Sequence, residues 1–368
     1  MFGRILQDKY HFSGVQANMP FSVAVICFAL GFVVAGRIHD RTGPRFTCAV
    51  GAIIYGAGLA IAGLCGPRFW TVLLGTGVMM GLGIAFGYIG PLATAVKWFP
   101  ERKGTVTGIV VGSFACGAFI LGAVAKALIA HGMTIFGVFV LFGIVGGGAV
   151  LLLSLLMKVP ETPPGDEAGR ATGLPDGLMK SGHFWSLALA FFSGTFAGLA
   201  VTGSLEKIGM TMGAAEWWVG AGFLLWSIGN MSGRVGWGLL FERIGMRRAV
   251  VASLVFQSAT IALLLLFGNY GPAFAVLAFC SGFNYGGNFV LYAAEVAHTY
   301  GAHRVGTVYS IIYVVYCASG FLSPFIMGKS FDLRQAYTLG LIIAAVVPVA
   351  GVTAFLLFYR RPWEKAPL

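Results

Sequence analysis

Long apolar stretches without charged residues dominate the chain, and short polar segments separate them. Ten stretches of 17 or more residues contain no Asp, Glu, Lys or Arg. They span residues 10–36, 46–67, 69–96, 104–125, 127–157, 181–205, 217–233, 249–294, 305–328 and 335–359. The eighth stretch is long enough for two helices, and Gly-Asn-Tyr-Gly-Pro at 268–272 interrupts it. The pattern therefore predicts eleven transmembrane helices of about 20 residues each.

The composition agrees with a membrane protein rather than a soluble one. Of the 368 residues, 58% are hydrophobic and 10% are charged, and the mean hydropathy is +0.85. Soluble domains carry about 25% charged residues. A membrane β-barrel would show alternating strands of about ten residues, which this pattern lacks. We therefore expect an all-α membrane protein, and the 55 glycines suit helices whose backbones pack closely.

The net charge of +11 comes from basic residues that stand singly or in small groups between the apolar stretches. This placement indicates charge that sets membrane topology, and it disfavours nucleic-acid binding. One set of alternate loops carries 16 basic residues and the other set carries 7. The richer set comprises Arg37, Arg41, Arg45, Lys97, Arg102, Lys103, Lys158, Arg170, Lys180, Arg243, Arg247, Arg248, Arg304, Arg360, Arg361 and Lys365. The bias predicts a multi-pass protein of the plasma (inner) membrane with a cytoplasmic C-terminus and an external N-terminus.

The only long polar connection, rich in proline and acidic residues, divides the predicted spans into five and six. Such a segment is typical of a linker between two domains. We predict an N-terminal bundle over residues 1–157, a cytoplasmic linker over 158–181 and a C-terminal bundle over 182–368.

A short motif recurs between the two halves at an offset of 202 residues. GRIHDRTGPR begins at Gly36, and GLLFERIGMR begins at Gly238. The same offset aligns Arg102 with Arg304, which indicates a parallel repeat of two halves. A motif glycine lets helices approach closely, and a motif acid can meet a helix N-terminus or an Arg. We expect a gating motif, which could lock one access state, at Gly36, Asp40, Arg41, Arg45, Gly238, Glu242 and Arg243. The alternative is that the arginines only set topology.

The repeat also predicts a helix before the first residue. The second half begins its first helix near Ser181, and its counterpart would lie about 20 residues before Met1. On this interpretation residues 1–15 are the end of that helix and the loop after it. A start codon placed too late and a natural truncation both remain open.

The doubled motif resembles that of the major facilitator superfamily, and the resemblance covers nearly the whole chain. GLGIAFGY from Gly81, KWFPERKG from Lys97 and NYGGNF from Asn284 further resemble the oxalate/formate antiporter family and related bacterial monocarboxylate transporters. The resemblance implies two helical bundles that move small organic anions by alternating access. The Gly-Pro motif of drug antiporters is absent between Gly108 and Gly122, which disfavours multidrug efflux.

Arg234 is the only charged residue well inside a predicted span. Placing an Arg there costs about 2.5–3.5 kcal/mol, and such a residue normally faces a wet cavity or a counter-charge. No acid lies one turn away, because Asn230 and Gly238 hold the i−4 and i+4 positions. A guanidinium in this setting suits a carboxylate substrate. The resemblance implies the same, since an Arg of the eighth family helix binds substrate there. The alternative is an Arg that snorkels to the cytoplasmic side.

Polar residues on other spans are expected to turn inward, because lipid offers their polar ends no partner. Tyr309, Tyr313 and Tyr316 share one face of a helix. The candidate substrate-binding residues, besides Arg234, are Tyr285, Asn284, Asn288, Tyr88, Tyr313 and Tyr309. The alternative for the tyrosines is interhelical packing or an interfacial position.

The substrate prediction depends on the number of buried cations. The oxalate transporters of the resembled family carry a Lys in the eleventh helix, whereas residues 306–313 contain none. One cation matches one carboxylate, so we expect a monocarboxylate such as lactate or formate. An oxalate/formate-type exchanger and a truncated, non-transporting anion sensor are the alternatives.

Proton coupling requires a titratable group near the path, and Glu206 and Glu295 are the candidates. We interpret both as ordinary charges at helix ends. The partner ion is then a proton or a counter-anion. We expect no enzymatic activity, because no catalytic constellation is visible. We also expect no cofactor and no metal, and a monomer in the lipid bilayer.

Overall fold

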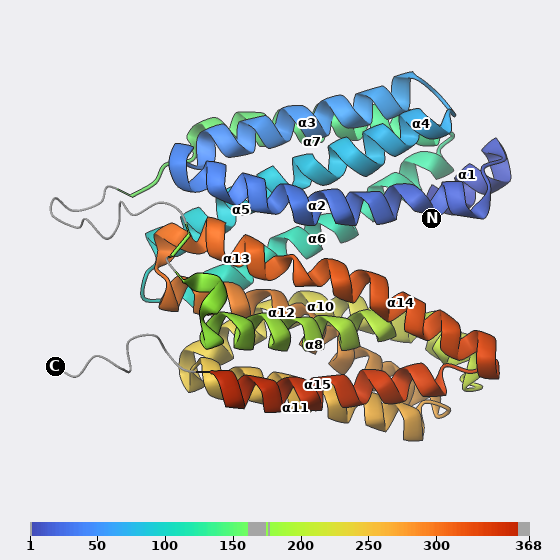
Figure 1. Ribbon diagram of the computed structural model, residues 1–368. Coiled ribbons are helices and arrows are strands. Elements are labelled where there is room, and N and C mark those ends of the chain that lie inside the picture. Colours follow the sequence, from blue (N-terminus) through green and yellow to red (C-terminus); the bar gives the residue numbers. More distant parts are fainter. Residues whose placement is uncertain (1, 161–173, 176, 360–368) are drawn as a thin grey trace, which may run out of the picture. The chain divides into compact units, whose positions relative to one another are not determined.

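The computed structural model describes residues 2–160, 174–175 and 177–359 (Figure 1). This part of the chain divides into two compact units, which are described separately. Unit 1 comprises Met1–Trp98, Cys116–Gly173 and His303–Ser310. Unit 2 comprises Phe99–Ala115, Leu174–Ala302 and Ile311–Leu368. Each unit thus contains a short segment from the other half of the chain.

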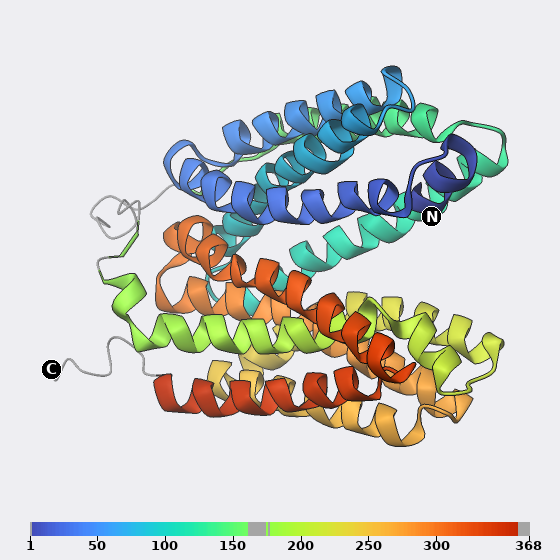
Figure 2. The same ribbon diagram turned by 45° about the vertical axis from the view of Figure 1, so that its right-hand side comes forward.

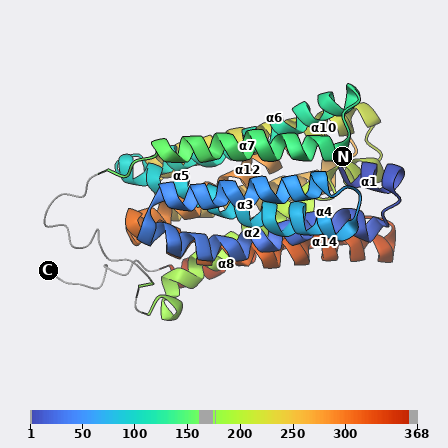
Figure 3. The same cartoon turned by 90° about the horizontal axis from the view of Figure 1, so that it is seen from above.

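Unit 1 is built around α3, which packs against α5 and α7, while α2 packs against α5 (Figure 3). Its helices are α1 (Phe2–Tyr10), α2 (Gly14–Thr42), α3 (Pro44–Leu64), α4 (Phe69–Val72), the π-helix η1 (Leu73–Met79), α5 (Met80–Trp98) and α7 (Ile135–Leu156). It also holds the second part of α6 (Lys103–Ala130) and most of α13 (Val305–Tyr313).

Local signals explain where the helices of unit 1 begin and end. Ser13 begins α2 with a capping box, because its hydroxyl accepts from the Gln16 amide and the Gln16 side chain accepts in return. Gly43 ends α2 at φ +80°, a conformation that favours glycine, and Pro44 begins α3. In unit 2, Gly245 ends α10 (Glu216–Ile244) in the same way at φ +74°, as the repeat predicts.

Unit 2 is built around α12, which packs most extensively against α10 and also contacts α8 and α11. Figure 2 shows α8 in green beside α15 in red. The helices are η3 (Leu178–Lys180), α8 (Gly182–Thr202), α9 (Leu205–Thr211), α10 (Glu216–Ile244), α11 (Met246–Phe267), α12 (Gly271–Thr299), η4 (Ala302–Arg304), α14 (Val315–Arg334) and α15 (Thr338–Phe358). The first part of α6 completes the unit.

Glycines let α10 and α12 pack with their backbones close together. A Cβ on Gly233 would collide with the carbonyl oxygen of Phe283, and a Cβ on Gly282 would collide with that of Trp226. The close packing expected from the glycine content is therefore present here.

Ten helical segments of the described chain are long and apolar enough to cross a membrane. The predicted count of eleven is not confirmed. The predicted span 217–233 does form a helix, as part of the 29-residue α10, but it is not among the ten. Its tryptophans, glycines and Asn230 lower its mean hydropathy. Most of the predicted linker, together with Arg170, Arg360, Arg361 and Lys365, lies outside the described residues.

Candidate functional site

Arg234 lies on α10 and is 7% exposed. One guanidinium nitrogen donates to the carbonyl oxygen of Val111 on α6 at 2.6 Å, and Nε donates to Oδ1 of Asn230 at 3.3 Å. The guanidinium also lies over the Phe289 ring, 5.4 Å from its centroid. Within the described residues no carboxylate forms an ion pair with it. The side chain is therefore a buried cation that neutral groups hold in place.

Aromatic side chains from three helices form a cluster beside this cation. The Phe289 centroid lies 5.2 Å from that of Tyr285 and 5.6 Å from that of Tyr316. The hydroxyls of Tyr285 and Tyr316 form a hydrogen bond of 3.0 Å, and both lie within electrostatic range of Arg234. Tyr313 joins the group, 6.0 Å from Phe289. Unit 2 thus brings three tyrosines and one cation together.

Two predicted site residues of α12 take part in a different network. Asn284 accepts from the Ser253 hydroxyl at 3.0 Å and donates to Gln257 at 2.8 Å, and both partners lie on α11. Asn288 donates to the Asn284 carbonyl oxygen at 3.1 Å, and a Cβ on Gly194 of α8 would collide with its side-chain oxygen. The structure does not bring these amides to Arg234. Their contacts hold α12 against α8 and α11.

Tyr88 and Tyr309 belong to unit 1 and pack on one phenylalanine of α2. The Phe32 centroid lies 5.6 Å from that of Tyr88 and 5.9 Å from that of Tyr309. The predicted tyrosine face of 309–316 is interrupted at Val314, where a turn separates α13 from α14. Tyr309 therefore has different neighbours from Tyr313 and Tyr316.

The acid of the first motif caps a helix from the other half of the chain. Oδ2 of Asp40 accepts from the backbone N–H of Thr307 at 2.9 Å and from its hydroxyl at 2.6 Å, in the first turn of α13. Lys97 lies within electrostatic range of this partly buried carboxylate. A Cβ on Gly36 would collide with the carbonyl oxygen of Gly306. We call this contact set the Asp40 cap.

The second motif makes the related contact in unit 2. Glu242 accepts from the backbone N–H of Thr105 at 2.8 Å and from its hydroxyl at 2.7 Å, in the first turn of α6. A Cβ on Gly238 would collide with the carbonyl oxygen of Gly104. This Glu242 cap repeats the Asp40 cap at the offset of 202 residues. Of the two partners expected for the motif acid, both caps use a helix N-terminus.

The motif arginines are not part of either cap. Arg41, Arg45 and Arg243 are exposed, and Nε of Arg45 donates to the Met157 carbonyl oxygen at 2.6 Å. These positions fit the alternative in which the arginines contribute positive charge at a membrane face.

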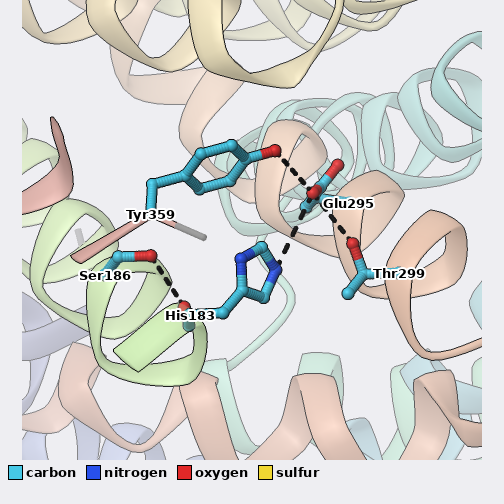
Figure 4. A network of polar contacts seen from close by, with 5 residues as sticks. All are labelled: His183, Ser186, Glu295, Thr299 and Tyr359. Carbon is cyan, nitrogen blue, oxygen red and sulfur yellow. Dashed lines mark hydrogen bonds and ion pairs between the residues drawn. The ribbon is translucent and has the colours of Figure 1, made fainter. Parts of the chain in front are cut away.

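The two acids considered for proton coupling differ in burial. Glu206 is exposed near the start of α9, as an ordinary helix-end charge would be. Glu295 is fully buried in α12, 3.8 Å from His183 (Figure 4). The interpretation of Glu295 as an ordinary charge at a helix end is therefore wrong.

Several neighbours of Arg234 are not among the predicted site residues. Phe289 could have been found because it follows Tyr285 by four residues on the same helix face. Tyr316 belongs to the predicted tyrosine face, which alone does not place it beside Arg234. The carbonyl oxygen of Val111 leaves no signal in the sequence, since every residue of a helix carries one.

Comparison with known proteins gives a consistent result. The family model described as Major Facilitator Superfamily matches residues 1–324. The uncharacterized MFS-type transporter YhjX of Escherichia coli K12 is 25% identical over 85% of this chain and 79% of its own. The oxalate:formate antiporter of Oxalobacter formigenes is 23% identical over 78% of this chain and 71% of its own. Apicoplast pyruvate carrier 1 of Toxoplasma gondii is 24% identical over 77% of this chain and 64% of its own.

A solved structure supports the fold. The fucose:proton symporter FucP of E. coli superimposes with a TM-score of 0.75 over 98% of this chain and 94% of its own, at 14% identity. At that identity the similarity concerns the fold alone.

Proposed function

Because the chain belongs to the Major Facilitator Superfamily, we propose that it is a secondary transporter that moves small monocarboxylates by alternating access, with Arg234 binding the carboxylate. Membership of this family makes the chain a transporter, and the ten apolar helical segments of its described part are consistent with a multi-pass membrane protein. The plasma (inner) membrane, the cytoplasmic C-terminus and the monomeric state belong to the proposal.

The buried guanidinium of Arg234 carries the proposal. A cation inside a membrane protein normally has a counter-charge or faces a wet cavity. Arg234 has only neutral partners in the described residues, namely an amide, a backbone carbonyl and an aromatic ring. A carboxylate would complete this arrangement, because a guanidinium binds it through two parallel N–H···O bonds.

The neighbouring tyrosines give the proposed site its second feature. Tyr285 and Tyr316 hold their hydroxyls 3.0 Å apart within electrostatic range of the cation. Each hydroxyl can donate to a small anion, and the rings of Phe289 and Tyr313 supply apolar surface. We propose that these groups orient the substrate. Tyr88 and Tyr309 keep the role predicted from the sequence as a further proposal.

One cation favours a single negative charge on the substrate. Pyruvate, named for one relative, is a monocarboxylate, and another relative is named as an oxalate:formate antiporter. Oxalate carries two carboxylates and would leave one of them without a cation at this site. An oxalate/formate-type exchanger is therefore the second candidate, which the relative from Oxalobacter favours.

The two caps would serve as latches in this mechanism. Each motif acid holds the first turn of a helix from the other half of the chain. We propose that these bonds stabilise the state closed to the cytoplasm and break when the transporter opens inward. The proposed halves are the bundles over residues 1–157 and 182–368, joined by the linker over 158–181.

Uptake into proteoliposomes tests the proposal. We expect labelled lactate to enter vesicles that contain the wild type, and labelled oxalate to stay outside. Arg234→Gln should lower lactate uptake at least about tenfold, because charge-assisted hydrogen bonds contribute about 1.5–3 kcal/mol. Arg248→Gln is the matched control, since Arg248 is exposed on α11 and its loss should leave uptake unchanged.

Other results would redirect the proposal. Oxalate uptake that depends on Arg234 would favour the exchanger. If the folded protein takes up neither anion, monocarboxylate transport is rejected and the anion sensor becomes the better hypothesis. Equal uptake by Arg234→Gln and the wild type would show that Arg234 does not bind the substrate.

A further inference from the structure

Arg234 connects α10 to the first part of α6, both of which belong to unit 2. Its Nη1 donates to the Val111 carbonyl oxygen at 2.6 Å, and the Glu242 cap joins the same two helices at Thr105. The two places lie about 9 Å apart along α6, at 1.5 Å per residue. We call the stretch from Thr105 to Val111 and from Arg234 to Glu242, held by these bonds, the α6–α10 contact.

Glycines line the α6 side of this contact. Gly104, Gly108 and Gly112 recur every four residues and therefore share one face of the helix. A Cβ on Gly104 would collide with the carbonyl oxygen of Gly238, and a Cβ on Gly108 with that of Arg234. The backbones approach closely here, and these three positions bring no side chains that could interlock. The hydrogen bonds therefore matter more for the stability of the contact.

The nitrogens of Arg234 that a substrate needs are already in use. A guanidinium presents two edges to a carboxylate, and each edge is a pair of nitrogens with parallel N–H bonds. Nε donates to Oδ1 of Asn230 at 3.3 Å, and Nη1 donates to Val111. One of these two nitrogens belongs to each edge, because both edges share Nη2. A carboxylate that forms two bonds with Arg234 therefore engages a nitrogen that already has a neutral partner.

The Val111 carbonyl can give up this bond at a small cost. A carbonyl inside a helix also accepts from the amide four residues later, so it keeps a partner. Oδ1 of Asn230, in contrast, has Arg234 as its donor within the described residues, and an acceptor that loses its only donor bears a desolvation cost. A carboxylate is also the stronger acceptor for a guanidinium, because both partners are then charged.

We propose that the substrate carboxylate replaces the Val111 carbonyl as the acceptor of Arg234 Nη1, so that substrate binding releases α6 from α10 at one of the two places that hold them. The inference rests on the proposed function and adds how the substrate loosens one latch. After the exchange, the Glu242 cap is the remaining hydrogen-bonded part of the α6–α10 contact. Substrate binding and the cap then oppose each other, and linkage requires that a weaker cap raises the affinity for substrate.

Equilibrium binding of labelled lactate to the full-length protein in detergent tests this opposition. We expect Glu242→Gln to bind lactate about twofold to fivefold more tightly than the wild type, because a weaker cap raises the fraction of molecules whose Arg234 is released. Thr105→Val removes one of the two bonds of the cap and should shift the affinity in the same direction by a smaller factor. Ser113→Ala is the matched control, because this exposed hydroxyl of α6 bonds to Ile109 within its own helix. Its affinity should equal that of the wild type.

A double-mutant cycle measured by thermal unfolding tests the same contact without a substrate. If both places hold one contact, the loss of either weakens the other. Arg234→Gln combined with Glu242→Gln should then lower the unfolding temperature by less than the sum of the two single shifts. Arg234→Gln with Glu206→Gln is the control pair, and its shifts should add, because Glu206 is exposed near the start of α9.

The outcomes separate this inference from the proposed function. Wild-type lactate affinity in folded Glu242→Gln, or additive shifts in the cycle with Glu242, would overturn the exchange at Val111 and leave lactate transport intact. Unchanged affinity would also indicate that the carboxylate uses the edge beside Asn230. A folded wild type that binds no lactate would overturn the proposed function and the exchange together.

Discussion

The Asp40 cap and the Glu242 cap have the same chemistry in different surroundings. In both, one carboxylate accepts from the backbone N–H and the hydroxyl of a threonine in the first turn of a helix. The Asp40 carboxylate is partly buried, and its Oδ1 makes no hydrogen bond within the described residues. The Glu242 carboxylate is exposed. The repeat has therefore preserved the bonding pattern and not the environment.

Because of this difference, two caps with the same hydrogen bonds can contribute unequally to the free energy of unfolding. A hydrogen bond to an exposed carboxylate competes with water, whereas a buried donor that loses its partner also bears a desolvation cost. The glycines beside both caps are equally constrained, because each faces the backbone of a second glycine. We therefore expect the two caps to respond alike to changes at glycine and unequally to changes at the acid.

The largest effect is expected at the motif glycines. Gly36→Ala and Gly238→Ala each place a Cβ against a backbone oxygen, which can move only if the helices separate. Overpacking of this kind costs about 3 kcal/mol, and thermal unfolding in detergent should show a large loss of stability in both variants.

Two glycine positions with open space beside them provide the controls. A Cβ at Gly148 of α7 or Gly220 of α10 would meet nothing within 4 Å. Alanine is favoured over glycine inside a helix, so Gly148→Ala and Gly220→Ala should be neutral or slightly stabilising. If all four variants unfold at similar temperatures, the close approach of the motif glycines has no energetic importance.

The second effect should separate the caps. Asp40→Asn weakens both bonds from Thr307 in a partly buried place and should cost about 2–3 kcal/mol. Glu242→Gln makes the same change in solvent and should cost about 1 kcal/mol or less. Thermal unfolding measures the change in stability. Substrate uptake measures whether the variant cap still serves as a latch during transport. Equal losses in the two variants would show that burial does not distinguish the caps.

The smallest effect concerns the threonine hydroxyls. Thr307→Val removes one hydrogen bond from the Asp40 cap and should cost about 1 kcal/mol, while Thr105→Val should cost about half of that. Measuring each threonine variant also in combination with the variant of its acid gives the coupling energy of the pair. A coupling energy at Glu242 as large as that at Asp40 would contradict the ranking.

The sequence predicts the helical fold and the repeat well, because both leave strong signals. Uncharged stretches mark the spans, and the offset of 202 residues identifies two related motifs. The predicted span 217–233 forms a helix, but the count of eleven membrane spans is not confirmed. The helix α10 carries tryptophans, glycines and Asn230, which lower its mean hydropathy.

The site was harder to predict, because membrane helices are apolar on several faces and the sequence does not show which face turns inward. Arg234 stands out because a charge is rare inside a span. Asn284 and Tyr285 are adjacent, yet one bonds to α11 and the other lies near Arg234. Glu295 is buried beside His183, which lies 112 positions earlier in the sequence and has no motif in common with it.

The reciprocal caps bear on the origin of the chain. The acid of the first half holds a helix of the second, and the acid of the second half holds a helix of the first. Two identical copies of one half could make both bonds at once, since each would donate and receive the same contact. Duplication of one such half, followed by fusion of the two copies, would produce this reciprocal pattern. Either half expressed alone would be expected to bind a second copy of itself.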